Sequence, residues 1–184
     1  MFSIVSLAAA AVLLARNAVA NPIARAACNP TLTSGTAISI GGGSLEIGYT
    51  SSVPGAAIIS ETLSTTAAEF FAIPATIENG GYVLQVVNQD NHSPRLFPTW
   101  VNGTLELETL VTPEDGKQGF GFVCSSCSDP STVGIGGVIG ASCNVVSGWT
   151  GQCLQIGSAV GDAVTIANCA DLGSGSQYFD IYLA

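Results

Sequence analysis

Side chains that could carry out acid–base chemistry are few in this 184-residue chain. Its one histidine, His92, lies in the polar stretch 88–94, where a solvated loop residue is commoner than a catalytic or metal-binding one. Glu106 and Glu108 alternate along an expected strand, and a glycosidase needs two carboxylates roughly 5 to 9 Å apart. Alternating glutamates on a strand usually mark a solvated face. We therefore expect no catalytic residue, no metal site, no cofactor and no enzymatic activity.

Two further motifs resemble functional sites but lack the sequence context that those sites need. Cys124-Ser125-Ser126-Cys127 has the C-x-x-C spacing of redox dithiols, but no βαβ pattern surrounds it. The glycine-rich run 134–140 has no helix-forming stretch after it and no basic residue nearby, unlike a dinucleotide-binding loop. The first motif indicates structural disulfides, and the second indicates a flexible loop.

The N-terminal residues predict secretion. Residues 4–14 form an apolar run that is too short to span a bilayer but has the length of a signal-peptide core. Ala18-Val19-Ala20 has the small side chains that signal peptidase needs before its cut. We expect residues 1–20 to be removed, and Arg25 allows a second cut that would release a short propeptide.

The cysteines and two sequons agree with an extracellular location. The six cysteines all follow the expected cut and form an even set, which fits three disulfides in an oxidising compartment. Asn102-Gly103-Thr104 is an N-glycosylation sequon. Asn91-His92-Ser93 is a second sequon, less favoured because Pro94 follows it directly. We expect a secreted, disulfide-bonded glycoprotein.

The charge and the apolar runs of the mature chain each argue against one class of partner. After Arg25 the remaining basic residues are Arg95 and Lys117, against all 13 Asp and Glu of the chain. Such a surface repels phosphate backbones, so nucleic acid is not expected as a partner. No apolar run after the signal peptide approaches eighteen residues, so we expect no membrane insertion of the mature form.

Short strands and a threefold repeat are the main structural signals. Abundant Gly, Val, Ile and Thr without a sustained 3.6-residue period predict an all-β fold. An [E/Q]-x-F-x-[I/F] pattern at 69–73, 118–122 and 177–181 predicts three strands with two apolar side chains on one face. A second apolar pattern precedes each of them, at 44–47, 83–86 and 153–156. The spacing predicts one domain over 26–184 with units at approximately 26–73, 74–122 and 123–184, and an exposed loop around 91–103.

The last unit, from Gly151 through Cys153 and Cys169 to Phe179, resembles a repeat of the ricin B-chain-like lectin family. That family has a C-[LV]-D-like strand, a G-x-A-[VI]-x-[LI] strand ending in a second Cys, and a closing Q-x-[WF]. The resemblance implies a β-trefoil with pseudo-threefold symmetry, and it implies a disulfide between Cys153 and Cys169. The last 34 residues match well, whereas the first two units match only in their apolar pattern.

The remaining four cysteines are not paired by the resemblance. Six cysteines allow fifteen connectivities in all. We favour Cys127 with Cys143, which would close the insertion between the second and third units, and Cys28 with Cys124, which would tie the N-terminal strand to the third unit.

The family's sugar site is mostly lost in the best-matching unit. Gln155 stands where the family has Asp, Ala167 where it has a stacking aromatic, and Ser176-Gln177 where it has Asn-Gln. We therefore expect no galactose binding there and look to the middle unit, where Trp100→Ala should abolish glycan retention and leave the fold intact. Trp149 is the other exposed aromatic candidate. The candidate carbohydrate-binding residues are Trp100, Gln85, Asn102, Gln155 and Asp162.

The resemblance implies a secreted, non-catalytic, lectin-like protein that binds a neutral glycan or an extracellular protein through its loops. The alternative is a secreted β-trefoil protease inhibitor, in which the insertions at 88–103 and 124–143 would enter the cleft of an enzyme.

Overall fold

The computed structural model describes residues 27–76, 81–87, 94–110, 116–172 and 174–184. The expected signal peptide and propeptide, the Asn91 sequon and His92 lie outside the described residues. Within the described ranges, no helix is long and apolar enough to cross a membrane.

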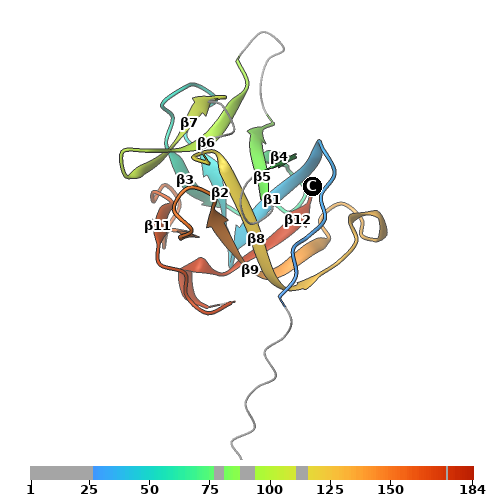
Figure 1. Cartoon of the computed structure of the whole chain (residues 1–184). Coiled ribbons are helices and arrows are strands. Elements are labelled where there is room, and N and C mark those ends of the chain that lie inside the picture. Colours follow the sequence, from blue (N-terminus) through green and yellow to red (C-terminus); the bar gives the residue numbers. More distant parts are fainter. Residues whose placement is uncertain (1–26, 77–80, 88–93, 111–115, 173) are drawn as a thin grey trace, which may run out of the picture.

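The described residues form strands joined by turns, with two short 3-10 turns, η2 (Pro130–Thr132) and η3 (Gly175–Gln177) (Figure 1). The expected all-β fold is confirmed. The strands are β1 (Thr36–Gly42), β2 (Leu45–Tyr49), β3 (Ile58–Thr62), β4 (Phe70–Ala75), β5 (Gly81–Val86), β6 (Leu96–Val101), β7 (Thr104–Thr109), β8 (Gly119–Cys127), β9 (Val138–Ser147), β10 (Cys153–Gln155), β11 (Thr165–Ala167) and β12 (Phe179–Leu183).

Six of the strands pair in a closed ring. In order around the ring, β1 pairs with β4, β4 with β5, β5 with β8, β8 with β9, β9 with β12, and β12 again with β1, all antiparallel. The closing pair places Ile40 opposite Ile181, so the first and last strands of the described residues lie side by side. Closure leaves none of these six strands as a free sheet edge.

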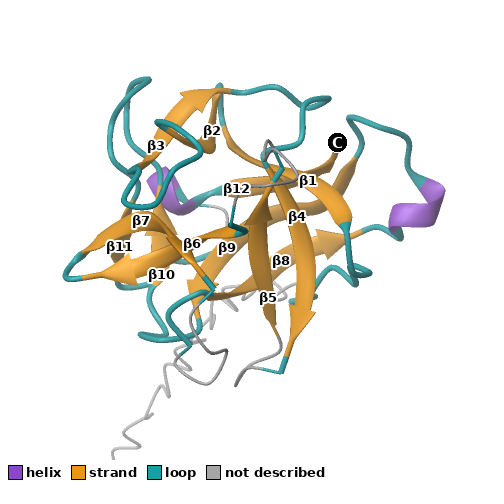
Figure 2. Ribbon diagram, turned by 90° about the horizontal axis from the view of Figure 1, so that it is seen from above, coloured by secondary structure: helices purple, strands orange, loops and turns teal. Residues whose placement is uncertain are grey.

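The other six strands form three hairpins, β2–β3, β6–β7 and β10–β11. Figure 2 shows them gathered on one side of the ring. Isolated bridges link the first hairpin to the other two, from Ala57 to Glu106 and from Ile59 to Ala163. Backbone bonds of 2.8 Å from Leu107 N to Ala56 O and 3.1 Å from Val164 N to Ile58 O support these links. The three hairpins therefore form one connected layer.

The core lies inside the ring and beneath the hairpins, and it consists of alternate side chains of the strands. Its largest fully buried members are Phe70, Phe120, Phe122, Phe179, Ile38, Ile40, Ile58, Leu84, Leu96, Leu107, Ile139 and Ile181.

The repeat pattern placed some strands correctly and others not. Phe120 with Phe122, and Phe179 with Ile181, are buried as expected. In the first unit the buried pair is Phe70 and Ala72, one residue earlier than the pattern placed it, because Phe70 pairs with the fully buried Ile38 of β1.

Two strand assignments in the middle unit also need correction. Residues 83–86 belong to the ring strand β5, whereas the matching segments 44–47 and 153–156 overlap the hairpin strands β2 and β10. The hairpin strand of the middle unit is β6, which occupies 96–101 and thus the central part of the stretch expected to be a loop. The apolar pattern alone cannot distinguish a ring strand from a hairpin strand, because both bury one face.

All six cysteines are in disulfides, as expected. Cys153 pairs with Cys169, which agrees with the pairing that the resemblance implies. The other two expected pairs are wrong, since Cys124 pairs with Cys143 and Cys28 pairs with Cys127.

The geometry of the β8–β9 hairpin explains the pairing. Cys124 lies directly opposite Cys143 in the register, and both are fully buried on the core face. Cys127 is an odd number of residues further along β8, so its side chain lies on the other face, opposite Gly140. It is therefore placed to pair with Cys28, whose backbone bonds to that of Cys124 at 2.9 and 2.8 Å. The expected tie between Cys28 and Cys124 is a backbone bridge and not a disulfide.

Candidate functional site

The two tryptophans of the chain line one shallow groove of about 450 Å³. We call it the tryptophan groove, and its lining residues are Thr99, Trp100, Val101, Asn102, Glu108, Lys117 and Trp149. They come from β6, the β6–β7 turn, β7, the segment before β8 and the turn after β9. The groove thus joins three parts of the chain that are distant in sequence.

The β6–β7 hairpin places Trp100 and Asn102. Trp100 pairs with Leu105, and its ring is partly buried against the core. Asn102 and Gly103 form the two-residue turn with φ values of 47° and 98°. Asn-Gly is the preferred dipeptide for such a turn because both residues tolerate the left-handed region. Asn102 is therefore held at the exposed tip of the hairpin.

Trp149 is carried by a tight turn between β9 and β10. Ser147 O accepts from Gly151 N at 2.9 Å, and Ser147 N donates to Gln152 O at 2.8 Å. Gly148 N donates to Gly119 O at 2.8 Å, which attaches the turn to the start of β8. Because the turn is fixed at both ends, Trp149 is presented to solvent with 53 % of its surface exposed.

Lys117 and Gln118 connect the two tryptophans. Trp100 N donates to Lys117 O at 3.0 Å, and Lys117 Nζ lies 5.2 Å from the centre of the Trp149 ring, within cation–π range. The buried Gln118 side chain donates to Thr99 Oγ1 at 2.8 Å and to Thr109 O at 2.9 Å. This network fixes the 117–118 segment against the hairpin, which sets the relative positions of the two rings.

The groove has the chemistry of a site for neutral sugars. An indole ring offers a flat apolar face to the C–H groups of a pyranose, and Thr99, Asn102, Glu108 and Lys117 offer donors and acceptors for hydroxyls. Its two charged side chains, Glu108 and Lys117, have opposite signs.

The structure places some of the predicted carbohydrate-binding residues in the tryptophan groove and others away from it. Trp100 and Asn102 line the tryptophan groove, and Gln85, Gln155 and Asp162 do not. Gln85 lies on β5 opposite Phe71, and Gln155 lies on β10 opposite Thr165.

Asp162 closes a turn of its own chain. Its Oδ2 accepts from Ala159 N and Ser158 N at 2.9 Å and from Ser158 Oγ at 3.1 Å. These bonds, led by the one from Ala159, hold the pKa of Asp162 below its usual value. This oxygen is thus engaged in shaping the 158–162 loop.

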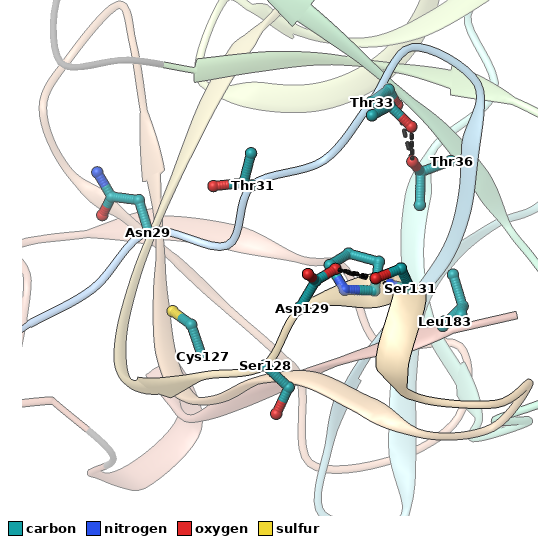
Figure 3. A pocket seen from close by; sticks show the side chains of 10 residues that line it. Asn29, Thr31, Thr33, Thr36, Cys127, Ser128, Asp129, Ser131 and Leu183 are labelled. Carbon is teal, nitrogen blue, oxygen red and sulfur yellow. Dashed lines mark hydrogen bonds between the residues drawn. The ribbon is translucent and has the colours of Figure 1, made fainter.

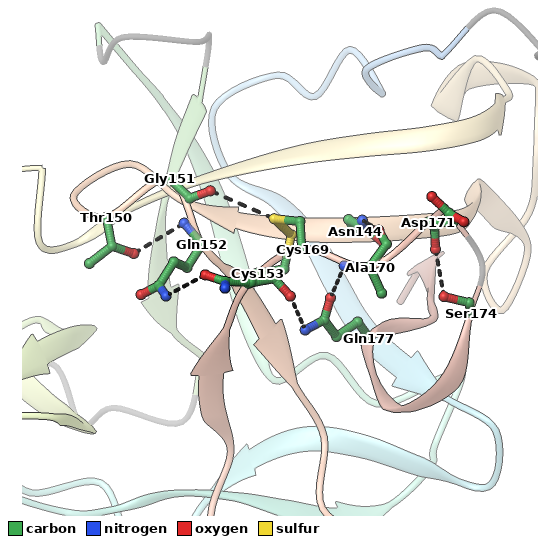
Figure 4. Close-up of a disulfide and its surroundings, with 11 residues drawn as sticks. Asn144, Thr150, Gly151, Gln152, Cys153, Cys169, Ala170, Asp171, Ser174 and Gln177 are labelled. Carbon is green, nitrogen blue, oxygen red and sulfur yellow. Dashed lines mark hydrogen bonds between the residues drawn. A yellow bond between two sulfur atoms is a disulfide. The ribbon is translucent and has the colours of Figure 1, made fainter.

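The last unit uses its polar side chains internally (Figure 4). The buried Gln177 accepts from Ala170 N at 2.7 Å and donates to Asn168 O at 2.9 Å. Asn144 Nδ2 donates to Ala170 O at 2.9 Å, and the Cys153–Cys169 disulfide lies beside this network. The glutamine of the closing Q-x-F pattern therefore anchors the loop that follows Cys169.

A larger pocket of about 820 Å³ is lined in part by Cys127, which forms a disulfide with Cys28 (Figure 3). Its lining is rich in hydroxyls and includes Thr31, Thr33, Thr36, Ser128, Asp129 and Ser131. No aromatic side chain is among the lining residues, so it offers no face on which a sugar ring could stack.

Three carboxylates gather where β2 and β3 meet the segment before β4. Glu46 pairs directly with Glu61, and Glu46 is only 2 % exposed, accepting from Ser39 Oγ and, at 3.0 Å, from Ser64 N. Burial raises the pKa of Glu46. Burial, together with the like charges of Glu46 and Glu61, raises the pKa of Glu69 to about 7. A hydrogen bond with Tyr49 acts in the opposite direction and lowers this pKa. Glu46 is too buried to reach a substrate, and the partly exposed Glu61 and Glu69 line neither the tryptophan groove nor the pocket beside Cys127, so we assign this cluster no catalytic role.

No protein-family model matches the chain, and no curated protein matches it in sequence. The lectin resemblance of the last unit stays a prediction. Of the groove residues, Thr99, Val101, Glu108 and Lys117 were not expected as contacts. No signal in the sequence could have identified these residues, because the fold is needed to bring them to Trp149.

Proposed function

We propose that this chain is a secreted, non-catalytic, lectin-like protein whose tryptophan groove binds a neutral glycan. The observation that carries the proposal is the convergence of both tryptophans with Asn102, Glu108 and Lys117 on one groove. Aromatic faces flanked by hydrogen-bonding side chains are what recognition of a pyranose needs.

The proposal includes a β-trefoil fold of the ricin B-like kind. Three features support it: the closed ring of six strands, the three hairpins on one side of it, and the division into four-strand units over 36–75, 81–127 and 138–183. The sequence resemblance of the last unit adds to them. Each unit contributes two ring strands and one hairpin, as threefold repetition requires.

The charge of the groove favours a neutral ligand over an anionic one. The whole chain has a formal net charge of −9, whereas the groove holds one cation and one carboxylate. An acidic polysaccharide would be repelled by the rest of the surface. A neutral glycan meets no such penalty and gains stacking on the rings.

The first prediction is that Trp149→Ala weakens glycan binding without loss of stability. Trp149 is exposed, so its removal leaves no core cavity, but it takes away a stacking face worth about 1 to 2 kcal/mol, or roughly 5- to 30-fold in Kd. The mature chain, made in a host that does not N-glycosylate, is screened on an array of neutral glycans, and the Kd of the best binder is measured for both proteins by calorimetry.

The matched control is Val160→Ala, which removes an exposed apolar side chain outside the groove and should leave the Kd unchanged. Binding by Trp149→Ala as tight as by the unmodified chain would contradict the proposal. Trp100→Ala is a poorer test than the sequence suggested, because Trp100 packs against the core and its loss should also lower Tm.

A second candidate function, protease inhibition, is favoured by one observation. Ile135 is 73 % exposed at the tip of the loop between η2 and β9, and Gly136 N donates to Leu183 O at 2.6 Å to hold that tip against β12. A fixed, exposed apolar side chain suits the primary pocket of a protease. Inhibition of elastase-type serine proteases that is lost in Ile135→Asp would favour this function over glycan binding.

A further inference from the structure

The acceptor asparagine of the described sequon is itself part of the tryptophan groove. Asn102 lines the groove, and it is followed by Gly103 and by Thr104, whose hydroxyl the sequon needs. Asn102 and Thr104 are both exposed at the hairpin tip. An N-glycan attached here would therefore begin at the wall of the site that we assign to glycans.

A sugar attached at Asn102 has a strong advantage over a free one. Single neutral sugars bind such shallow sites with Kd values of roughly millimolar strength. A tether of a few bonds creates an effective concentration that is also about millimolar or higher, without any new contact. The attached sugar thus occupies the groove for much of the time unless its geometry forbids contact with the rings.

The geometry brings the rings close to the attachment point. Trp100 is two residues before Asn102 on the same hairpin, and Lys117, bonded through its backbone to Trp100, has its ammonium over Trp149. The positive φ of Asn102 is fixed by the two-residue turn, which limits the directions available to the first sugar.

We propose that the N-glycan on Asn102 folds back into the tryptophan groove, so that the chain's own first N-acetylglucosamine is the resident ligand and free glycans compete with it. This inference rests on the proposed function of the groove and adds a means of regulating it. Access for an external glycan then depends on whether Asn102 carries a glycan.

The modification itself uses a lipid diphosphate-linked oligosaccharide as donor. Nδ2 of Asn102 forms a bond to C1 of the terminal N-acetylglucosamine, and the bond from C1 to the diphosphate oxygen breaks. The lipid diphosphate leaves with the electron pair, and Nδ2 loses one proton.

The test compares four proteins secreted by a host that N-glycosylates. They are the unmodified chain, Trp149→Ala, Val160→Ala as the surface control, and Ser93→Ala, which removes the other sequon and lies outside the described residues. Intact mass and glycopeptide mapping establish the glycan on Asn102, and release of that glycan by a peptide N-glycosidase is then timed under native conditions. We expect roughly twofold faster release from Trp149→Ala than from the other three, because an attached sugar that occupies the groove about half of the time shields its linkage for that time. An unmodified Asn102, or equal rates in all four, would overturn the inference.

A second measurement separates this inference from the proposed function. Thr104→Ala removes the sequon and keeps Asn102, Trp100 and Trp149 in place, so its groove is empty of attached sugar. We expect it to bind chitotriose roughly twofold more tightly than the glycosylated chain does, since an attached sugar no longer competes for the groove. If Thr104→Ala binds no neutral glycan while Trp149 still slows release of the attached one, the proposed function and the competition by free glycans fail, and only the folding of the attached glycan into the groove stands. If both proteins bind equally well, the inference fails and the proposed function stands.

Discussion

Replacing Cys124 and Cys143 together by alanine should lower the free energy of unfolding by about 4 kcal/mol. The disulfide closes a loop with a sequence separation of 19, which corresponds to about 3 kcal/mol of chain entropy. Both sulfurs are fully buried in the core, so their loss also leaves a cavity that costs about 1 kcal/mol. Urea unfolding followed by fluorescence measures the difference.

The Cys153–Cys169 pair is the matched control for this prediction. Its sequence separation of 16 gives almost the same loop entropy, but Cys169 is exposed. The alanine double variant of this pair should therefore lose less stability than that of Cys124 and Cys143. Equal losses would show that burial of the Cys124–Cys143 disulfide adds nothing to the loop term.

Glu69→Gln should stabilise the protein at pH 7.5 by about 1 to 2 kcal/mol, a range that allows for the partly exposed position of this side chain. The amide keeps the shape of the carboxyl but cannot be charged, so it avoids both the burial penalty and the repulsion from Glu46 and Glu61. We expect a Tm increase of roughly 3 to 6 °C, measured by calorimetry.

The same carboxyls set a pH dependence with a definite sign. The pKa of Glu69 is raised from 4.5 to about 7 in the folded protein, so between these values the folded state binds more protons than the unfolded state. The part of the stability that depends on protonation of Glu69 is therefore fully present below about pH 4.5 and is lost as the pH rises through 7. Glu69→Gln should flatten this slope and have little effect at pH 4.

Asp129→Asn is a control, because this carboxyl affects the pH dependence of stability in the opposite direction to Glu69. Hydrogen bonds from Ser131 N and Ser131 Oγ lower the pKa of Asp129. The contribution of Asp129 to stability is therefore present above the pKa that this carboxyl has in the unfolded chain, and it is lost as the pH falls. This variant should leave the slope between pH 4.5 and 7 in place. A stability curve of the unmodified chain that rises from pH 4.5 to 7 would contradict the assigned role of Glu69.

The all-β class could be predicted because composition and short alternating patterns depend on local residues alone. The exact register could not. Phe70 and Phe71 are adjacent aromatics, and only the pairing of Phe70 with the fully buried Ile38 decides which of them enters the core. Cys124 and Cys127 pose the same problem, because their partners depend on which face of β8 each occupies.

The candidate site was predictable only in part for a similar reason. Trp100 and Asn102 share a hairpin whose Asn-Gly turn is readable in the sequence. Trp149 joins them because β8 and β9 pair, so that Gly148 bonds to Gly119 next to Lys117 and Gln118. Contacts between segments this far apart are set by topology, and a single sequence carries no direct record of them.

The most direct test of the proposed glycan site follows the two indole Nε1–H signals by NMR. The chain has only two tryptophans, so Thr104→Ala protein labelled with ¹⁵N gives one signal for each. Neutral trisaccharides built from N-acetylglucosamine, glucose, mannose or galactose are titrated in turn. For at least one of them, both indole signals should shift along a single saturation curve with one Kd, because both rings line one groove. If neither signal moves with any of these sugars, or if the two follow different curves, the tryptophan groove is not a single glycan site.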